Sequence, residues 1–407
     1  MRQKSKADQK TTLRDAGTWF GGLTPSMAND RFWTDGSIPW ATPKDFTQRV
    51  IASTEYKVTP EAVAETCLKV IPPKSLLVVF RSGILRRRLP VGLSGTPLTI
   101  NQDVKACICT DAYNPEYLYH YLVYNESRIL RECAKTGTTV ESIDSNSFLS
   151  FRLIVPNKLV QNYITSTLST WDRAIEQTER LLALKEKRKR ALMQQLLTGK
   201  RRFSGYSARW PLVHLGDLFL ERNETSREDL PLLSITADRG VIPRTEIDRK
   251  DTSNENKALY KRIVPGDIGY NTMRMWQGVS AVSTLEGIIS PAYTVCIPCN
   301  KILVEFAGYL FKFGPMIHLF YRHSQGLVDD TRNLKYDNFR RIAVALPSLE
   351  EQRRIAAVLN TCDEELRLLR AQLEAFRLQK KGLMQRLLTG DLRVPESYLK
   401  HHEGGES

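Results

Sequence analysis

The sequence predicts a mixed α/β (α+β) protein in which two globular domains are separated by two long antiparallel coiled-coil helices, with an internal pseudo-twofold repeat. Three observations predict it: a stretch that occurs twice, a long proline-free segment around each copy, and a heptad seam along both segments. The copies read KRALMQQLLTGK (189–200) and KKGLMQRLLTGD (380–391), a shift of 191 in 407 residues. Because a prolyl ring breaks a helix interior, we expect both segments to be helical.

The composition is that of a globular protein with more than one domain and a basic surface. Apolar residues make up 42% of the chain, charged residues 26%, and the formal net charge is +14. This charge suits a polyanionic partner, usually nucleic acid, although a soluble protein can be basic without one. No apolar run could span a membrane, and the N-terminus lacks the apolar core of a signal peptide. We therefore expect a cytoplasmic protein whose seven cysteines are reduced.

The first domain is predicted over residues 1–156. Short β-branched runs at 75–80 and 105–109 indicate strands. Apolar residues at every third or fourth position predict a helix over 116–131.

The two spacer helices are predicted over 157–200 and 348–395. Their seam positions alternate at spacings of four and three residues, which is the pattern of a coiled coil. The first seam is Ile164, Leu168, Trp171, Ile175, Thr178, Leu182, Lys185, Lys189, Leu192 and Leu196. The second is Ile355, Leu359, Cys362, Leu366, Leu369, Leu373, Phe376, Lys380, Leu383 and Leu387. The shift of 191 holds at every position, and Phe148, Pro156 and Gln161 likewise recur as Phe339, Pro347 and Gln352. The sequence therefore predicts a tandem duplication.

The second domain is predicted over residues 201–347, with strand-like runs at 230–236 and 292–298. Ser348, followed by Glu351, has the pattern of a capping box at the start of the second helix. Residues 396–407 are predicted to form a flexible tail.

Charge predicts the direction in which the two helices pair. Each helix carries its basic cluster late, at 185–190 and 377–386, so parallel pairing would place like charges together. Antiparallel pairing places the first cluster beside 363–365 and the second beside Asp172 and Glu176. Each exposed pair contributes less than about 1 kcal/mol, but all of them favour the antiparallel arrangement.

The sequence lacks recognisable catalytic signatures. It contains no GxGxxG, HExxH or GxSxG, and Thr198-Gly199-Lys200 lacks the upstream glycine of a P-loop. Cys296-x-x-Cys299 could bind zinc or perform redox chemistry, but a second pair at ligand spacing is missing. These absences weigh most against adenylate-cofactor and metal-dependent nuclease chemistry.

Several motifs resemble those of the DNA-specificity subunit of type I restriction–modification systems, over nearly the whole chain. In RLIVPNKLVQNYI (152–164) and RIAVALPSLEEQRRI (341–355), a short strand and a proline lead into a helix start. GGLTPS (21–26), DGSIPWATPKDF (35–46) and Leu215-Gly216-Asp217 are similar to further family motifs, as are the two LMQ-x-LLTG helix ends. Two features depart from the family: Leu23 interrupts a Gly-Gly-Thr-Pro run, and the first domain has Leu13-Arg14-Asp15 where the second has Leu-Gly-Asp.

The resemblance implies a non-catalytic DNA-binding subunit. Each globular domain would be a target-recognition domain that reads one half of a bipartite, asymmetric site in double-stranded DNA. The helices would set the spacing and dock two methyltransferase (modification) subunits. Those partners would flip adenine and methylate it with S-adenosylmethionine, and endonuclease (restriction) subunits would join them to cut DNA. This chain would itself hold no cofactor or metal and have no membrane partner.

Reading bases requires Arg, Lys, Asn or Gln on exposed loops, and further cations contact phosphates. The candidates in the first domain are Lys44, Arg81, Arg86, Arg87 and Arg88, for which a solvated basic turn is the alternative. The candidates in the second domain are Arg239, Arg244, Asn271, Arg274, Trp276 and Gln277. Met273, Met275 and Trp276 could instead be core residues of a strand. The cations of the helices could pair with acidic residues or line the DNA path.

Two other functions compete with DNA recognition. A coiled-coil scaffold that binds only protein would not need the basic loops, and it would show no salt-dependent DNA affinity. A catalytic methyltransferase or nuclease would need the missing motifs, and cofactor binding by the isolated chain would favour it.

Overall fold

The computed structural model describes residues 9–135, 140–247, 256–326, 328 and 331–403. The chain divides into two compact units, unit 1 (Met1–Gln177 with Leu373–Ser407) and unit 2 (Thr178–Gln372). Both divisions fall inside a long helix, so each unit holds one globular domain and part of both helices. In the described part of the chain, no helix is both long enough and apolar enough to cross a membrane.

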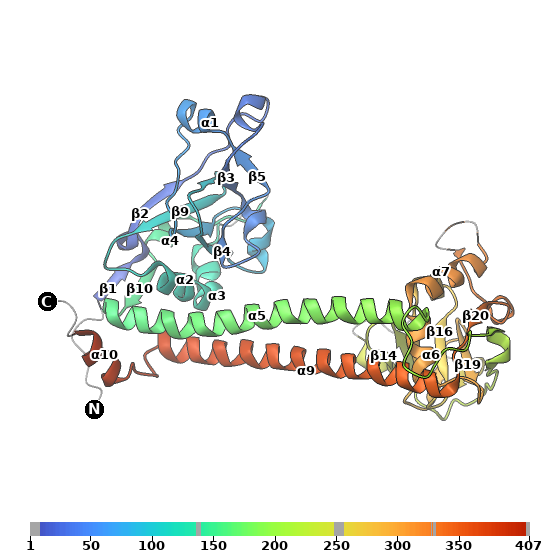
Figure 1. Cartoon of the computed structure of the whole chain (residues 1–407). Coiled ribbons are helices and arrows are strands. Elements are labelled where there is room, and N and C mark those ends of the chain that lie inside the picture. Colours follow the sequence, from blue (N-terminus) through green and yellow to red (C-terminus); the bar gives the residue numbers. More distant parts are fainter. Residues whose placement is uncertain (1–8, 136–139, 248–255, 327, 329–330, 404–407) are drawn as a thin grey trace. The chain divides into compact units, whose positions relative to one another are not determined.

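Unit 1 contains short strands joined by loops (Figure 1). Its strands are β1 (Gln9–Thr12), β2 (Gly17–Gly21), β3 (Ile38–Ala41), β4 (Val50–Ile51), β5 (Tyr56–Val58), β6 (Leu76–Val79), β7 (Val91–Ser94), β8 (Thr99–Ile100), β9 (Val104–Cys109) and β10 (Arg152–Val155). Its helices are α1 (Pro60–Glu65), α2 (Pro115–Tyr124), α3 (Glu126–Cys133), α4 (Ser145–Leu149), α10 (Glu396–Glu403) and parts of α5 (Lys158–Leu197) and α9 (Leu349–Leu388). Its 3₁₀ turns are η1 (Leu13–Ala16), η2 (Asp30–Phe32), η3 (Pro43–Asp45) and η4 (Gly83–Arg86).

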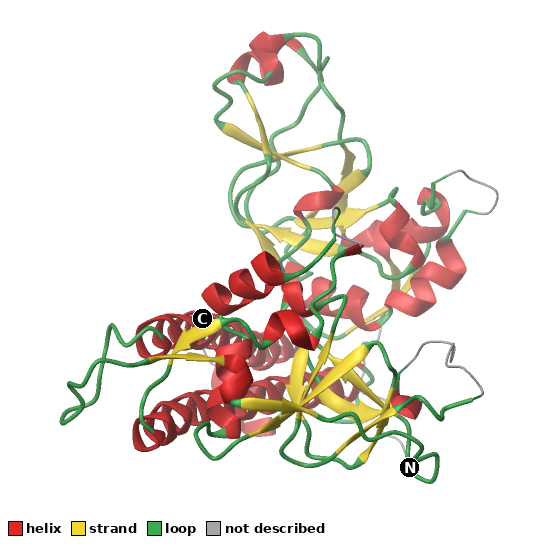
Figure 2. Ribbon diagram, turned by 90° about the vertical axis from the view of Figure 1, so that its right-hand side faces the viewer, coloured by secondary structure: helices red, strands yellow, loops and turns green. Residues whose placement is uncertain are grey.

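Unit 2 is built from the same kinds of element; strands are yellow and helices red in Figure 2. Its strands are β11 (Leu212–His214), β12 (Phe219–Glu221), β13 (Leu233–Thr236), β14 (Gly240–Pro243), β15 (Lys261–Ile263), β16 (Ile268–Asn271), β17 (Ser280–Val282), β18 (Gly287–Ile289), β19 (Tyr293–Pro298) and β20 (Ala343–Ala345). Its helices, besides parts of α5 and α9, are α6 (Val304–Phe311), α7 (Gly314–His323) and α8 (Tyr336–Phe339). Its 3₁₀ turns are η5 (Leu215–Asp217), η6 (Arg244–Glu246) and η7 (Met275–Gln277).

The main sheets of the two units have the same topology. The strand order is β2-β9-β6-β7 in unit 1, extended by β4, and β12-β19-β16-β17 in unit 2. In each unit the first and last strands also pair antiparallel, as β1 with β10 and β11 with β20. The predicted repeat therefore includes the globular domains, although their loops differ.

Each unit has a core in which the sheet, a helix that follows it and the two long helices meet. In unit 1, Phe148 and Tyr117 pack with Leu168 of α5 and Leu387 of α9. In unit 2, Phe339 of α8 and apolar residues of α6 and α7 pack with Leu196 of α5 and Leu359 of α9. Hydrophobic burial thus joins each domain to both helices.

The long helices pair antiparallel within each unit, as the charge pattern predicts. In unit 1, Asp172 of α5 binds Lys380 of α9. In unit 2, Lys185 binds Glu365 and Lys189 binds Asp363, so positions on α9 fall as positions on α5 rise. The apolar seam positions between them are buried or half-buried, since each helix covers the other's stripe.

The recurring glutamines of the repeat have the same structural role in each unit. The Gln161 side chain accepts a hydrogen bond from the backbone N–H of Asn114, the N-cap of α2, at 2.8 Å. The Gln352 side chain accepts one from the N–H of Leu303, the N-cap of α6, at 2.7 Å. Each amide also donates to the proline carbonyl before its own helix, at 2.9 Å. Both side chains are buried, so they satisfy backbone groups that water cannot reach.

Three local predictions differ from the structure. The helix predicted over 116–131 is two helices, because the chain turns at Asn125, where the side-chain amide bonds the Tyr121 carbonyl at 2.9 Å. The tail predicted as flexible contains α10, which begins after Pro395 and packs Tyr398 against Tyr163. These contacts supply order that composition alone does not indicate.

The third difference is the capping box at the start of α9, which is half present. The Ser348 hydroxyl accepts from the Glu351 backbone N–H at 3.4 Å. The Glu351 carboxylate instead binds Arg202 and the indole N–H of Trp210, the latter at 2.9 Å. Arg202 and Trp210, from the linker after α5, thus take the carboxylate that would otherwise complete the capping box.

Candidate nucleic-acid interface

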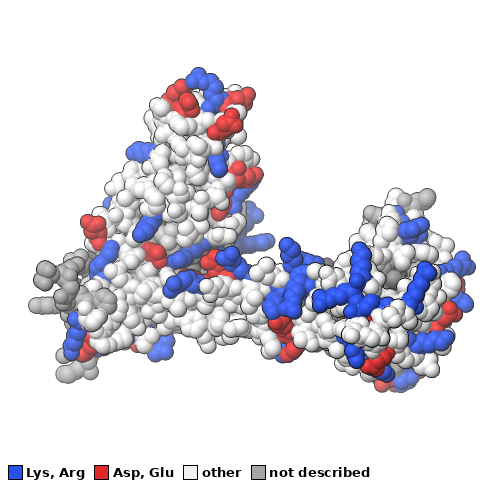
Figure 3. Space-filling model, viewed as in Figure 1, with Lys and Arg blue, Asp and Glu red and all other residues white. Residues whose placement is uncertain are grey.

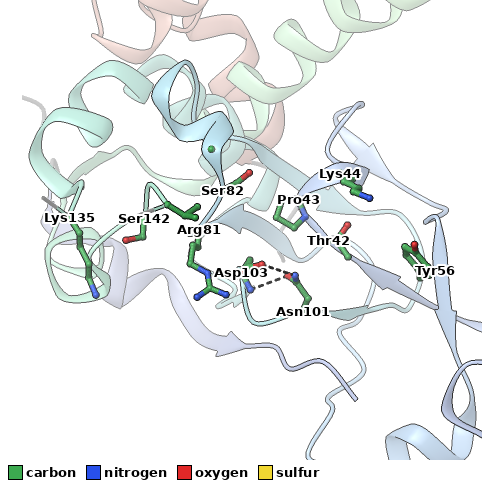
Figure 4. Close-up of a pocket in the computed structure, with 12 residues that line it drawn as sticks. Thr42, Pro43, Lys44, Tyr56, Arg81, Ser82, Asn101, Asp103, Lys135 and Ser142 are labelled. Carbon is green, nitrogen blue, oxygen red and sulfur yellow. Dashed lines mark hydrogen bonds and ion pairs between the residues drawn. The ribbon is translucent and has the colours of Figure 1, made fainter. Parts of the chain in front are cut away.

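A hollow of about 980 Å³ lies on the surface of unit 1 (Figure 4). It forms where η3, the end of β6 and the turn between β8 and β9 come together. Its lining residues are Thr42, Pro43, Lys44, Tyr56, Arg81, Ser82, Gly83, Asn101, Asp103, Lys135, Val140 and Ser142. The hollow brings together two predicted DNA-binding residues, Lys44 and Arg81, with a third cation, Lys135, that the sequence analysis missed.

Three predicted DNA-binding cations of unit 1 are held by carboxylates. Arg81 Nε lies 2.6 Å from Asp103, and Lys44 lies 3.7 Å from Glu55. Arg86 binds Glu141, and this hydrogen bond lowers the pKa of the Glu141 carboxyl. The carboxylates fix the directions of these cations while leaving them largely exposed.

The remaining arginines of this segment follow the same turn, η4. The Ser82 hydroxyl accepts from the Ile84 N–H, and Leu85 is buried, which anchors the turn. Arg87 is exposed, and Arg88 donates to the Phe46 carbonyl at 3.1 Å. Arg87 and Arg88 do not line the hollow.

In unit 2 the corresponding position, between β16 and β17, is occupied by η7. Met275 is fully buried, which confirms the core alternative for that residue, whereas Met273 is 46% exposed. Trp276 is half-buried, and its indole N–H donates to the Met273 carbonyl. Buried Met275 fixes the turn, so that Arg274 and Gln277 are exposed.

Three other predicted residues support this turn or lie near it. The Asn271 side chain accepts from the Met273 N–H at 3.0 Å and so shapes the start of the turn. Arg239, in the β13–β14 turn, binds Glu246 of η6, and Arg244 begins η6 half-buried. Lys312, the C-cap of α6, joins the two turns.

The Lys312 ammonium donates to the carbonyls of Gly278, at 3.0 Å, and Ala237, at 3.3 Å. Burial lowers the pKa of Lys312. The sequence analysis missed this residue because its role depends on two loops that are distant in sequence.

An aromatic and cationic cluster borders η7 and contains residues of α7 and, from the chain after it, Arg332. The Trp276 and Tyr321 rings meet edge to face at 6.3 Å, and His318 stacks on the same tyrosine. The Arg332 guanidinium lies 3.9 Å from the centre of the Tyr321 ring, an arrangement that suits a nucleic-acid surface. Of these residues only Trp276 was predicted; the i, i+3 spacing of His318 and Tyr321 is the sequence signal that could have indicated the others.

The cations of α5 have two kinds of environment. Lys185 and Lys189 bind carboxylates of α9, whereas Lys187, Arg188 and Arg190 are exposed. Figure 3 shows Lys and Arg side chains gathered over unit 2 where the second half of α5 lies. Of the two roles considered for the helix cations, pairing with acidic residues is therefore the one observed for Lys185 and Lys189.

The cysteines form no disulfide. All seven are free thiols, and burial raises the pKa of Cys296 well above its ordinary value. Within the described residues, no group of His, Cys, Asp and Glu is arranged to hold a metal ion.

Comparison with known proteins shows what this chain is similar to. Residues 9–186 match the type I restriction modification DNA specificity domain. This stretch is therefore similar to that family, which confirms the resemblance drawn from the sequence motifs.

Two relatives give the same result. The chain is 43% identical over 161 residues to the EcoR124I/EcoR124II specificity subunit of a type I restriction enzyme from Escherichia coli, covering 40% of each chain. It is 30% identical over 179 residues to the MjaIX specificity subunit from Methanocaldococcus jannaschii, covering 43% of this chain. The matches thus span only 40% of the length of each of these relatives.

A solved structure extends the similarity of fold to nearly the whole chain. The type I restriction–modification S subunit from M. genitalium aligns with a TM-score of 0.59 at 14% identity, covering 95% of this chain and 98% of the other. The predicted fold class, with two domains and long helices, is confirmed.

Proposed function

We propose that this chain is the DNA-specificity subunit of a type I restriction–modification complex, in which each globular domain reads one half of a bipartite site in double-stranded DNA. The observation that carries the proposal is the repeated sheet, β2-β9-β6-β7 and β12-β19-β16-β17. In both units the turn between the last two strands, η4 or η7, presents exposed arginine. Two domains with the same sheet topology suit the recognition of two half-sites, and the different sequences of η4 and η7 suit the recognition of different bases.

The remaining predicted residues divide by the contact that their chemistry suits. Arg81, Asn271, Arg274 and Gln277 can pair with base edges, whereas Lys44 and the arginines 86–88, 239 and 244 supply charge for phosphates. The half-buried Trp276 would hold η7 in place through its ring contact with Tyr321 of α7.

The paired helices would set the spacing of the half-sites and dock two methyltransferase subunits. Apolar side chains on their outer faces support a protein partner: Leu181 is 41%, Leu184 64% and Leu368 54% exposed. Exposed leucines on neighbouring helical turns are typical of a surface that another helix covers. The partners would supply S-adenosylmethionine chemistry, endonuclease subunits would join them, and this chain would recognise DNA without catalysing a reaction.

Selection from a pool of randomised DNA duplexes tests the proposal directly. The full-length chain should enrich duplexes that carry two fixed half-sites separated by a fixed number of unspecified base pairs. Binding should weaken steeply as salt increases, because counterions released from phosphates drive association. A pool that stays random at every salt concentration would contradict DNA recognition.

The exposed leucines also favour a second candidate, a coiled-coil scaffold that binds only protein. Replacing Leu184 and Leu368 with serine separates the two functions, since neither residue belongs to a reading turn. For a specificity subunit these changes should abolish capture of the methyltransferase subunit and leave the enriched DNA sequence unchanged.

A further inference from the structure

Arg81 occupies a defined position in the hollow of unit 1. It lies two residues after the end of β6, and its backbone N–H donates to the Asp103 carbonyl at 3.2 Å. Its side-chain Nε–H donates to Asp103 Oδ1 at 2.6 Å. The backbone and the side chain of one aspartate thus hold this arginine at both ends.

Asp103 is itself fixed by a buried neighbour. Its backbone N–H donates to Asn101 Oδ1 at 3.0 Å, and its Oδ2 accepts from Asn101 Nδ2 at 3.1 Å. Asn101 is 6% exposed, so it cannot exchange these bonds readily for water. Figure 4 shows Asn101 and Asp103 bonded beside Arg81.

The remaining donors of Arg81 are available to a ligand. Arginine has five N–H groups, and Asp103 takes only the one on Nε. The four on Nη1 and Nη2 have no partner within the described part of the chain, and the side chain is 55% exposed. A guanidinium held through Nε presents two parallel donors, which match O6 and N7 of guanine in the major groove.

The neighbouring cations lack this arrangement. The Lys44 ammonium is a point charge 3.7 Å from Glu55. The Arg88 guanidinium already donates a terminal N–H to the Phe46 carbonyl. Arg86 is paired with Glu141 on the exposed turn and does not line the hollow. Charge on these residues attracts phosphates, but only Arg81 in this group lines the hollow with an oriented guanidinium.

We propose that Arg81 reads a guanine in the half-site of the first domain, and that Asp103, oriented by Asn101, is the positioning residue for this contact. The inference rests on the proposed function and names the base, guanine, that the hollow of unit 1 would recognise. A bidentate contact of this kind gives about a 10- to 100-fold preference for the correct base.

The test is selection from a randomised duplex pool by the full-length chain and its variants. Wild type should enrich a half-site that contains a guanine whose identity depends on Arg81. Arg81→Lys keeps the positive charge but loses the paired donors, so that position alone should become unspecified while phosphate affinity is retained. The matched control Arg31→Ala, at another exposed arginine of unit 1 that is paired with a carboxylate but lies outside the hollow, should leave every base preference unchanged.

Asp103→Ala should relax the same position, because the guanidinium loses its orientation. The double variant Asp103→Ala, Arg81→Lys should be no less selective than Arg81→Lys alone, since both changes remove one contact. A fall in affinity that is uniform across sequences would instead mark Asp103 as merely structural and overturn its positioning role.

Chemical change of the base provides a second measurement that needs no variant. Replacing the specified guanine with 7-deazaguanine removes N7 and should weaken wild-type binding about 10-fold or more, with little effect on Arg81→Lys. If guanine persists at every enriched position in Arg81→Lys, or if the first half-site contains no guanine, the inference is wrong. A wild-type pool without any enriched sequence would refute the proposed function itself.

Discussion

The Trp171 ring of α5 meets the Phe376 ring of α9 edge to face, with centroids 5.7 Å apart and planes at 72°. Both residues are half-buried seam positions of unit 1. This contact reflects the antiparallel pairing of the two helices, because Trp171 lies in the first half of α5 and Phe376 in the second half of α9.

Loss of this aromatic contact should destabilise unit 1 by a measurable coupling energy. Edge-to-face pairs contribute about 0.5–1.5 kcal/mol beyond the area that they bury. A double-mutant cycle of Trp171→Ala and Phe376→Ala, followed by urea unfolding, measures it. Leu378→Ala, at a residue 72% exposed on the same helix, is the control and should change stability by less than about 0.5 kcal/mol. Strict additivity of the two ring deletions would contradict the contact.

The buried glutamines should be more important for stability than their polarity suggests. Gln161→Ala leaves the Asn114 N–H and the Pro156 carbonyl without their partner, and such a loss costs about 1–3 kcal/mol. Gln352→Ala should have an effect of the same size. Denaturation of both variants, compared with Gln177→Ala at an exposed position of α5, checks this expectation. Equal stability of all three would show that water replaces the bonds.

The buried His120 predicts an acid-sensitive unit 1. Burial lowers the pKa of His120 well below its ordinary value, and Lys380 and Arg49 lower it further. Below about pH 6.5 the unfolded chain therefore binds a proton that the folded chain does not, and stability falls as pH falls. The slope from this group can reach about 1.4 kcal/mol per pH unit.

Thermal or urea unfolding between pH 7 and 5 measures this slope. His120→Leu should flatten it, although Asp172, 3.7 Å from the ring, remains paired with Lys380. His214→Leu, at an exposed histidine, should leave the slope unchanged. A wild-type stability that is constant over this range would contradict the neutral buried imidazole.

Seven residues inserted into both long helices should change the DNA site if these helices set its spacing. The insertions belong between Trp171 and Lys185 in α5 and between Glu365 and Phe376 in α9, because the interhelix contacts on either side then keep their partners. A heptad preserves the seam and adds about 10 Å of helix, or about three base pairs. Selection from randomised duplexes should show unchanged half-sites with a longer gap, and an unchanged gap would contradict the proposal.

Local patterns in the sequence predicted the frame of this protein. The heptad seam predicted α5 and α9, the late basic clusters predicted their antiparallel pairing, and β-branched runs predicted strands such as β6 and β19. These features follow from side-chain periodicity and charge along one element, which can be read without knowing what the element packs against.

Only the tertiary structure determined how the candidate DNA-contacting loops and the buried glutamines are arranged. It brought Asn101 and Asp103 to Arg81, buried Met275 of η7, and brought both Trp276 and Arg332 to Tyr321. It also determined that Gln161 and Gln352 cap the loops before α2 and α6. Such contacts join irregular loops from distant parts of the chain, and their partners depend on how the sheets pack, which no local pattern records.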